Sequence, residues 1–433
     1  MTGVGKAGRE TGPTQQSLLD PVEVALGREG VFGWFSYVQD FDGEFAVRWL
    51  ERLREHGSTV WEPFSGSGTT LVAGKLLGVR VHGFDVNPFM AWVASTKLNW
   101  NLDPDDLRSL ADWVQERYQL LTPPEASGPV TAAWEDYPAI LAASPAVAYP
   151  PDKKLEKWIS PEVLARTSHL LSAIEAVDDA SSRDFFRLAA ASLLVGISNV
   201  KFQPNICYKS RPFTDVPLSM WFLERVAAMT HDLEEVRGRG KGQASVAVGD
   251  SRTVGPERAD AILTSPPYPN DMEYIHQTRL ELSILGFISE QADLTRLKKQ
   301  MISSSVKLVY RENEWQKELG LQLPGVREVF TTIAETLKGR NWGWNAADMV
   351  AQYFGGMRTV MGNWAVRLAP GGVAAVVVGD SAFNGVKVET DHLTAEAAEA
   401  EGLRVVEVVP FRKRWNTKHT TELRESVVLL RKP

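Results

Sequence analysis

Residues 263–274, LTSPPYPNDMEY, combine a hydroxyl, two prolines and aromatic rings directly after an apolar run. An exocyclic amine on a nucleobase is a poor nucleophile, because its lone pair is conjugated with the ring. Hydrogen-bond acceptors on the two amino hydrogens counteract this conjugation. The Ser265 hydroxyl and the Pro266 carbonyl are such acceptors, on a loop whose two prolines fix φ. Tyr268 offers a flat face on which a base flipped out of a helix can stack.

This stretch predicts chemistry on the amine of a nucleobase. The alternative is a proline-rich turn or a polyproline recognition segment, which usually lies in a disordered tail. Residues 263–274 instead follow the core-strand pattern ADAIL. The position after a strand therefore favours a catalytic loop.

A second stretch, EPFSGSGTT at residues 62–70, has the pattern of a ligand-binding turn. Glu62 ends a short apolar strand, and Gly66 and Gly68 precede the next predicted helix. Glycine takes left-handed backbone angles and lets a ligand approach closely, while the helix amino terminus offers free N–H groups. The turn lacks the GK[ST] ending of a phosphate-binding loop, so it predicts no triphosphate site.

Two aspartates follow further predicted strands. Asp85, in GFDVNP, lies about twenty residues after the glycine turn, where an acid in nucleotide-binding sheets accepts hydrogen bonds from ribose hydroxyls. The alternative is that Asp85 only caps the turn at Asn87 and Pro88. Asp250, in VGDSRTV, is placed to reach an adenine amino group, although aspartate after a strand is also common turn chemistry.

The elements that must position these residues form an α/β pattern of strand, glycine turn, helix and strand over residues 29–100. Helical patterns dominate residues 101–245, which we interpret as an insertion. Strand patterns resume over 246–433, interrupted by an excursion at about 288–345, and the last two predict a terminal antiparallel hairpin. Residues 1–28 are predicted to be a flexible tail. The predicted fold is a mostly parallel, doubly wound sheet with a large helical insertion.

The composition restricts the class of protein. The 433 residues, 44% of them hydrophobic and 23% charged, are typical of a globular enzyme. No run approaches the roughly 18 apolar residues of a membrane span, and the amino terminus lacks an apolar signal core. The single cysteine, Cys207, excludes a disulfide framework, and seven histidines without paired spacing predict no metal site. These features predict a cytoplasmic protein.

With these motifs in this order, the sequence resembles the S-adenosylmethionine-dependent DNA amino-methyltransferases, which modify cytosine N4 or adenine N6. The resemblance covers residues 32–100 and 246–433. EPFSGSGTT is similar to the cofactor motif of that family, which usually has aspartate at the position of Glu62. TSPPY is similar to its catalytic motif in the serine form, which mostly accompanies cytosine N4. The resemblance implies a Rossmann-like class I methyltransferase fold.

The same resemblance implies the cofactor S-adenosyl-L-methionine and direct methyl transfer to N4 of a cytosine flipped out of double-stranded DNA. No covalent enzyme intermediate is expected, because carbon-5 methylation needs a proline-cysteine loop and Cys207 lies in NICYK. The catalytic positions that it implies are Ser265, Pro266, Pro267 and Tyr268. The cofactor-binding positions that it implies are Tyr37, Glu62, Phe64, Ser65, Gly66, Gly68, Thr69, Asp85, Val86, Asp250 and Thr264.

The aromatic stretch WFSYVQDF at residues 34–41 resembles the segment that precedes the cofactor motif in this family and closes over the cofactor. Members often carry a proline and a basic residue there, whereas this chain has Gln39 and Asp40. The stretch PNDMEYIHQTRLELSILGF, residues 269–287, resembles the helix that follows the catalytic loop. Both segments are therefore expected to border the site.

The insertion either reads or clamps DNA or forms a helical lid. Its first candidate region is SNVKFQPNICYKSRPF, residues 198–213, where basic residues such as Lys201 alternate with aromatic ones such as Phe202. This mixture favours contact with phosphates and stacked bases. The second candidate region is the excursion at 288–345, which includes Trp342 and Trp344. The predicted DNA-binding residues are Lys201, Lys209, Arg211, Lys298, Lys299, Arg412, Arg414 and Lys418.

Other functions stay open at this point. Within the enzymes, these are adenine-N6 methylation of DNA and amine methylation of RNA. From a different class, the chain could be a catalytically inactive DNA-binding subunit of a defence complex, against which the intact TSPPY and glycine turn both speak. A cognate restriction or defence-system protein is a conceivable partner; a membrane is not.

Overall fold

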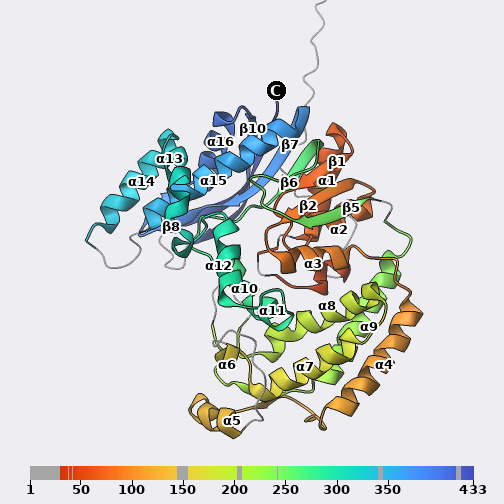
Figure 1. The fold of residues 1–433 in the computed structure, drawn as a ribbon. Coiled ribbons are helices and arrows are strands. Elements are labelled where there is room, and N and C mark those ends of the chain that lie inside the picture. The colour runs from red at the N-terminus through yellow and green to blue at the C-terminus, as the bar shows by residue number, and fades with distance from the viewer. Residues whose placement is uncertain are drawn as a thin grey trace, which may run out of the picture.

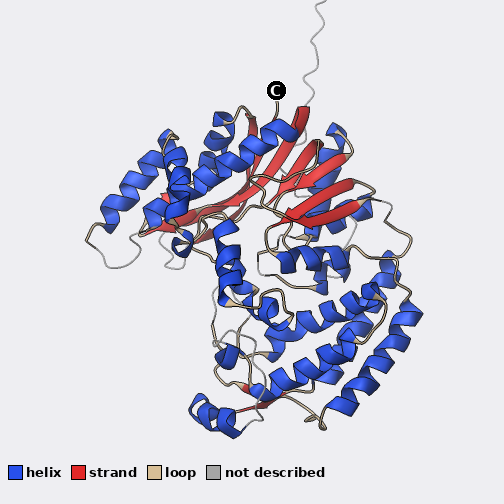
Figure 2. Cartoon of the chain, in the orientation of Figure 1, coloured by secondary structure: helices blue, strands red, loops and turns tan. Residues whose placement is uncertain are grey.

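The computed structural model describes residues 30–37, 39–40, 42–143, 155–201, 207–240, 242–339, 345–415 and 421–433. The predicted tail at 1–28, Phe202, Trp342, Trp344 and Lys418 lie outside these residues. A central sheet has strands in the order β10-β11-β7-β6-β1-β2-β5 (Figures 1 and 2). Its strands are β1 (Thr59–Glu62), β2 (Arg80–Asp85), β5 (Ala244–Val248), β6 (Ala259–Thr264), β7 (Leu368–Gly379), β10 (Arg404–Trp415) and β11 (Glu422–Arg431).

The directions of the strands confirm the predicted fold class. Strands β5, β2, β1, β6 and β7 pair in parallel, while β11 pairs antiparallel with both β7 and β10. The strands β10 and β11 form the terminal hairpin that the sequence predicted. The sheet is therefore mixed but mostly parallel, as in a Rossmann-like methyltransferase.

Both faces of the central strands are covered, which explains their almost continuous apolar sequences. Side chains of β6 alternate between two hydrophobic clusters: Ala261 and Leu263 belong to one, and Ile262 to the other. The first cluster is completed by α1 (Gly43–Leu53), α2 (Thr69–Leu77) and α3 (Pro88–Lys97). The second is completed by α14 (Pro324–Leu337), α15 (Ala346–Arg367) and α16 (Thr390–Ala400). Helices on both faces hold the strand ends in fixed positions.

Helix α15 also packs closely against α13 (Glu314–Gly320) through two glycines. A Cβ at Gly355 would lie 1.7 Å from the Gln316 carbonyl oxygen, and one at Gly320 would lie 2.0 Å from the Ala351 carbonyl oxygen. No other residue fits these positions without moving the backbone.

Residues between β2 and β5 hold the longest excursion from the sheet, which lies below it in Figure 1. Its helices are α4 (Pro104–Leu121), α5 (Tyr137–Ala143), α6 (Leu155–Trp158), α7 (Pro161–Glu175), α8 (Ala180–Ile197) and α9 (Leu218–Val236). A small antiparallel pair, β3 (Val130–Thr131) and β4 (Phe213–Asp215), joins two of its segments.

After β6 the chain makes a second excursion before it returns to the sheet at β7. Residues 269–287, expected to resemble one helix, instead contain two short ones, α10 (Tyr274–Gln277) and α11 (Arg279–Ile284), followed by α12 (Gln291–Gln300). A small hairpin, β8 (Ser381–Phe383) and β9 (Val386–Val388), follows β7. Short 3-10 turns lie at Gly30–Trp34, Arg54–His56, Trp134–Asp136, Val306–Leu308 and Arg311–Asn313.

Candidate functional site

The glycine turn between β1 and α2 has the backbone conformation that its sequence predicted. Gly66 and Gly68 have φ of +50° and +91°, in the left-handed region that favours glycine. A Cβ at Gly68 would lie only 2.8 Å from the Ala94 Cβ of α3. Gly68 thus lets α2 and α3 approach, whereas Gly66 lies at the surface of the pocket described below.

Asp85, the last residue of β2, both caps its own turn and holds the glycine turn. Its Oδ1 accepts a hydrogen bond from the Asn87 backbone N–H at 2.8 Å, and its Oδ2 accepts one from the Gly66 N–H at 2.8 Å. Burial raises the pKa of Asp85 to about 6, although these two hydrogen bonds lower it. The carboxylate also lines the pocket, so the capping role does not exclude a role toward a ligand.

A buried lysine attaches the segment before β1 to the glycine turn. The Lys97 ammonium donates to the Phe32 carbonyl at 2.9 Å, the Phe35 carbonyl at 3.3 Å and the Ser67 hydroxyl at 3.2 Å. The Ser67 hydroxyl in turn donates to the carboxylate of Asp40. Burial lowers the pKa of Lys97 to about 8. This chain of contacts fixes Asp40 beside the glycine turn.

The TSPPY loop begins where β6 ends. The Ser265 hydroxyl donates to the Tyr268 hydroxyl at 3.3 Å, which leaves the lone pairs of Ser265 Oγ available to an incoming N–H. The Tyr268 backbone N–H donates to the Tyr274 hydroxyl at 2.9 Å. Burial raises the pKa of Tyr268 to about 12, so its hydroxyl is protonated at neutral pH.

The segment after α12 holds the far end of this loop. Asp271 has a positive φ of 61°, unusual for a residue with a side chain, and its Oδ1 accepts from the Ser305 hydroxyl and the Val306 N–H, both at 2.9 Å. The Ser304 hydroxyl donates to the Met272 carbonyl at 2.8 Å. Asp271 therefore holds a strained conformation that its neighbours fix, as is common at functional sites.

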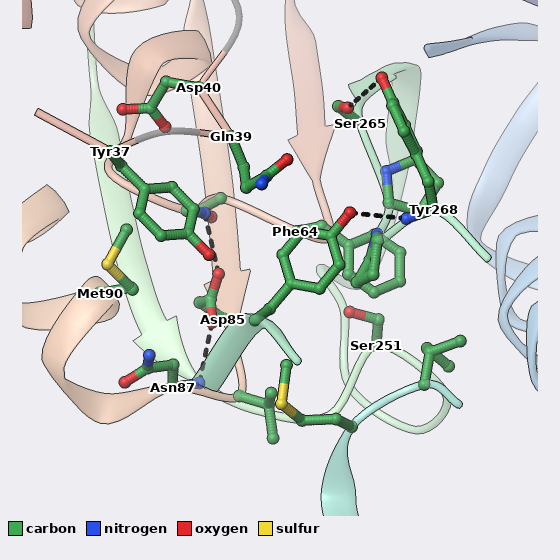
Figure 3. A pocket seen from close by; sticks show the side chains of 18 of the residues that line it. Tyr37, Gln39, Asp40, Phe64, Asp85, Asn87, Met90, Ser251, Ser265 and Tyr268 are labelled. Carbon is green, nitrogen blue, oxygen red and sulfur yellow. Dashed lines mark hydrogen bonds between the residues drawn. The ribbon is translucent and has the colours of Figure 1, made fainter. Parts of the chain in front are cut away.

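One pocket brings the glycine turn, Asp85 and the TSPPY loop together (Figure 3). Tyr37, Asp40 and Asp85 lie on one side of it, and Ser265 and Tyr268 lie on the other. Its empty space is about 950 Å³, open solvent at the mouth included. The predicted site residues that line it are Tyr37, Phe64, Ser65, Gly66, Thr69, Asp85, Val86, Asp250, Ser265, Pro266, Pro267 and Tyr268.

Three predicted cofactor-binding residues do not line the pocket: Glu62, Gly68 and Thr264. Other lining residues were not predicted. Five of these stand within the stretches that the sequence had singled out, and their polar side chains were a usable signal: Gln39, Asp40, Asn87, Ser251 and Tyr274. The lining residues without an assigned role in the sequence are Gln39, Asp40, Asn87, Met90, Ser251, Tyr274, Gln300, Met301 and Ile302.

Asp250 lines the pocket, but its carboxylate is already engaged. Arg252 Nη2 donates to Asp250 Oδ2 at 2.6 Å, and Arg252 Nε lies 2.9 and 3.0 Å from the two oxygens. Arg252 also donates to the Gln300 carbonyl at 2.9 Å. The pair thus connects the turn after β5 to the last residue of α12.

Glu62 is buried, with 1% of its surface exposed, and burial raises its pKa to about 8. Its hydrogen bonds from Thr264, Thr70 and Phe64 oppose this shift. The pKa is higher in the folded state than the usual value of 4.5. The stability that Glu62 contributes is therefore complete below about pH 4.5 and is lost as the pH rises to about 8.

We expect the Glu62→Gln variant to lose this part of the pH dependence, because glutamine is neutral and nearly isosteric. The Tm of the wild type minus that of the variant should fall as the pH rises from 5 to 8. The corresponding difference in the free energy of unfolding should fall by at most ~1.4 kcal/mol per pH unit. Thermal melts at several pH values measure this difference. The exposed Glu55→Gln variant is the control, and a flat difference for Glu62→Gln would contradict the shift.

The predicted DNA-binding residues have different surroundings. Lys201, Arg211 and Arg412 are exposed, and Arg412 Nη1 also lies 3.5 Å from Glu425 Oε2. The Lys209 ammonium donates to the Gly196 and Ser198 carbonyls, at 2.6 and 2.5 Å, where α8 ends, and burial lowers its pKa to about 8. The remaining described residues have protein partners: Lys298 pairs with Glu273, Lys299 with Glu312 at 2.7 Å, and Arg414 donates to the Asp380 carbonyl at 2.8 Å.

Two features are absent from the described residues. No group of three or more histidine, cysteine, aspartate or glutamate side chains among them could hold a metal ion. No helix in the same part of the chain is long and apolar enough to cross a membrane.

No protein-family model matches the chain. A curated protein similar to it is the type II methyltransferase M.BsoBI of Geobacillus stearothermophilus, which is 21% identical over 457 residues that cover 94% of this chain and 86% of that protein. Similar solved structures include two of the rRNA methyltransferase aviRa from Streptomyces viridochromogenes. They have TM-scores of 0.30 and 0.31 and 11% identity, and they cover 92% and 96% of this chain and 88% and 94% of those chains. The similarity to the type II methyltransferase, which extends over nearly the whole chain, supports methyltransferase activity.

Proposed function

We propose that this chain transfers a methyl group from S-adenosylmethionine to the N4 amine of a cytosine in double-stranded DNA. The observation that carries the proposal is the single pocket that joins the glycine turn and Asp85 to Ser265, Pro266, Pro267 and Tyr268. The motif resemblance adds DNA as the substrate, and the serine form of TSPPY adds cytosine.

The residues on the glycine-turn side fit this cofactor. S-adenosylmethionine supplies a methyl group on a positively charged sulfur, which retains the bonding electron pair when the amine attacks. The carboxylates of Asp40 and Asp85 both line the pocket and favour a ligand with a sulfonium and an ammonium group. Each Asp85 oxygen receives a backbone N–H and keeps a lone pair for a ribose hydroxyl.

On the other side, the loop is suited to hold an amine. Because the Ser265 hydroxyl donates to Tyr268, its oxygen accepts one amino hydrogen of the base. Pro266 and Pro267 have no N–H, so their backbone offers only carbonyl acceptors. These acceptors draw electron density toward the nitrogen, which attacks the methyl carbon and then releases a proton to solvent.

DNA contact is proposed for the exposed members of the basic set, Lys201, Arg211 and Arg412. Such residues neutralise phosphates. Lys209 and Lys298 are instead assigned to holding the ends of helices, because their ammonium groups already bind carbonyl or carboxylate oxygens. Residues 101–245 are proposed to act as the unit that contacts DNA beside the site.

Nucleoside mass spectrometry tests the proposal most directly. Unmethylated DNA is incubated with the protein and methyl-labelled S-adenosylmethionine, then digested to nucleosides. We expect labelled N4-methylcytosine. Labelled N6-methyladenine would support the proposed cofactor but reject cytosine as the target base. Label on RNA alone in a parallel reaction would reject DNA as the substrate. No label on either nucleic acid would reject the proposed activity.

Gly379, at the end of β7, leaves room for the ring of Tyr268. A Cβ at this position would lie 2.8 Å from Cε2 of that ring, so Gly379→Ala must displace Tyr268 and its hydrogen bond with Ser265. We expect methyl transfer to fall about tenfold, since small displacements of reacting groups are costly. Single-turnover rates measure the effect. Gly196→Ala is the control, because no atom lies within 4 Å of its added Cβ; equal rates for both variants would contradict the prediction.

A further inference from the structure

Glu62 connects three parts of the site without lining the pocket. Its Oε1 accepts hydrogen bonds from the Phe64 backbone N–H, at 3.0 Å, and from the Thr264 hydroxyl. Its Oε2 accepts one from the Thr70 hydroxyl at 2.7 Å. Glu62, Thr70 and Thr264 are each at most 1% exposed. The carboxyl group is therefore a buried junction with three donors.

The three donors come from different elements around the pocket. Phe64 belongs to the glycine turn and lines the pocket, and Thr70 lies in the first turn of α2. Thr264 is the last residue of β6, directly before Ser265. Through this junction, the turn on the cofactor side is connected to the loop on the amine side.

The backbone pairing of β1 and β6 ends before this junction. The parallel register of β1 and β6 has Val60 opposite Ala261 and Trp61 opposite Ile262, and it ends there. The side-chain hydrogen bond between Glu62 and Thr264 continues the connection past the last backbone pair. A buried hydrogen bond in a low-dielectric interior is strong and specific in geometry.

We propose that Glu62 is a positioning residue: through Thr264 it sets the separation between the glycine turn and the TSPPY loop. The inference rests on the proposed function, in which the methyl donor occupies the first side and the amine the second. Direct transfer requires the reacting atoms about 3–3.5 Å apart, and a displacement of 1 Å can cost about 100-fold in rate. The junction is therefore expected to affect the transfer step rather than cofactor binding.

Three variants separate positioning from other roles. Thr264→Val removes the hydroxyl at nearly constant volume and affects only the amine side. Glu62→Gln keeps an acceptor for Phe64 and Thr264 and can donate to Thr70 Oγ1, so it should preserve the junction. Thr167→Val in α7 is the matched control, because Thr167 is also 1% exposed and its hydroxyl donates at 2.7 Å to the Val163 carbonyl.

Single-turnover methyl transfer and calorimetric binding of S-adenosylmethionine are the first readouts. We expect Thr264→Val to transfer about 10- to 100-fold more slowly with unchanged cofactor affinity. Glu62→Gln and Thr167→Val should behave like the wild type in both. Transfer at the wild-type rate by Thr264→Val would overturn the inference, and so would a loss of cofactor affinity that accounts for the slower rate.

Hydrogen–deuterium exchange gives a readout that does not need activity. The Tyr268 N–H, bonded to the Tyr274 hydroxyl, reports on the loop. Thr264→Val should increase exchange in peptides covering 265–274, whereas Thr167→Val and Glu62→Gln should not. If the wild type neither binds cofactor nor methylates nucleic acid, the proposed function fails, and exchange still tests the junction. Unchanged exchange in Thr264→Val would then reject the positioning role.

Discussion

Replacing Ser265 by alanine is expected to slow methyl transfer by about 100- to 1,000-fold, the range found when one preorganised polar group is removed from a transition state. The reason is geometric, since the proposed function assigns Ser265 Oγ as the acceptor for the amine, with its proton directed to Tyr268 at 3.3 Å. S-adenosylmethionine affinity should not change, because the glycine turn and Asp85 do not depend on this hydroxyl.

Single-turnover rates with labelled cofactor measure the effect, and calorimetry measures the affinity. The control is Ser172→Ala, an exposed serine of α7 whose hydroxyl donates at 2.9 Å to the Ser168 carbonyl. If Ser265→Ala transferred methyl groups as fast as Ser172→Ala, the amine would have to be held by other groups.

Replacing Asp85 by alanine should weaken S-adenosylmethionine binding by about 100-fold or more, because hydrogen bonds to a charged group contribute about 1.5–3 kcal/mol each. The variant loses the proposed ribose contacts and also the support of the Gly66 N–H. Burial raises the pKa of Asp85 to about 6, so wild-type affinity should fall as the pH drops below this value and the carboxylate becomes protonated.

Calorimetry at pH 7.5 and pH 5 tests both statements about Asp85. Asp103→Ala is the matched control, because Asp103 likewise accepts a backbone N–H two residues ahead, that of Asp105 at 3.0 Å, but it caps α4 and does not line the pocket. Equal cofactor affinity of the two variants would show that Asp85 serves only its turn.

Elements could be predicted where their sequence patterns depend on local structure and not on contacts with distant residues. Continuous apolar runs identified β6 and β7, and the paired patterns at the end identified the antiparallel hairpin. The single helix expected over 269–287 was wrong, because the helix is interrupted at Thr278. The hydroxyl of Thr278 donates to the Ile275 carbonyl and accepts from the Asn87 side chain at 2.9 Å. Such a contact, 191 residues distant, leaves no local signal.

The candidate site likewise contains some residues that the local sequence predicted and others that only the packing of the chain brings to the pocket. Gly66, Asp85 and Ser265 follow strands or turns that their neighbours define, so their types and spacing placed them together before the structure did. Met301 and Ile302 border the pocket only because the chain returns there after α12. Glu62 lies in the expected motif, but its side chain faces Thr264 and Thr70 rather than the pocket, which only packing decides.

The adjacent strands β2 and β5 are separated by residues 86–243, which include all of α3 to α9. Closing a loop costs free energy that grows only with the logarithm of its length. Extending a connection from about 40 to about 160 residues therefore costs only ~1.2 kcal/mol. A domain of this kind can exchange or enlarge its helical excursion at little expense in stability, while the sheet that holds the pocket keeps the same strand order.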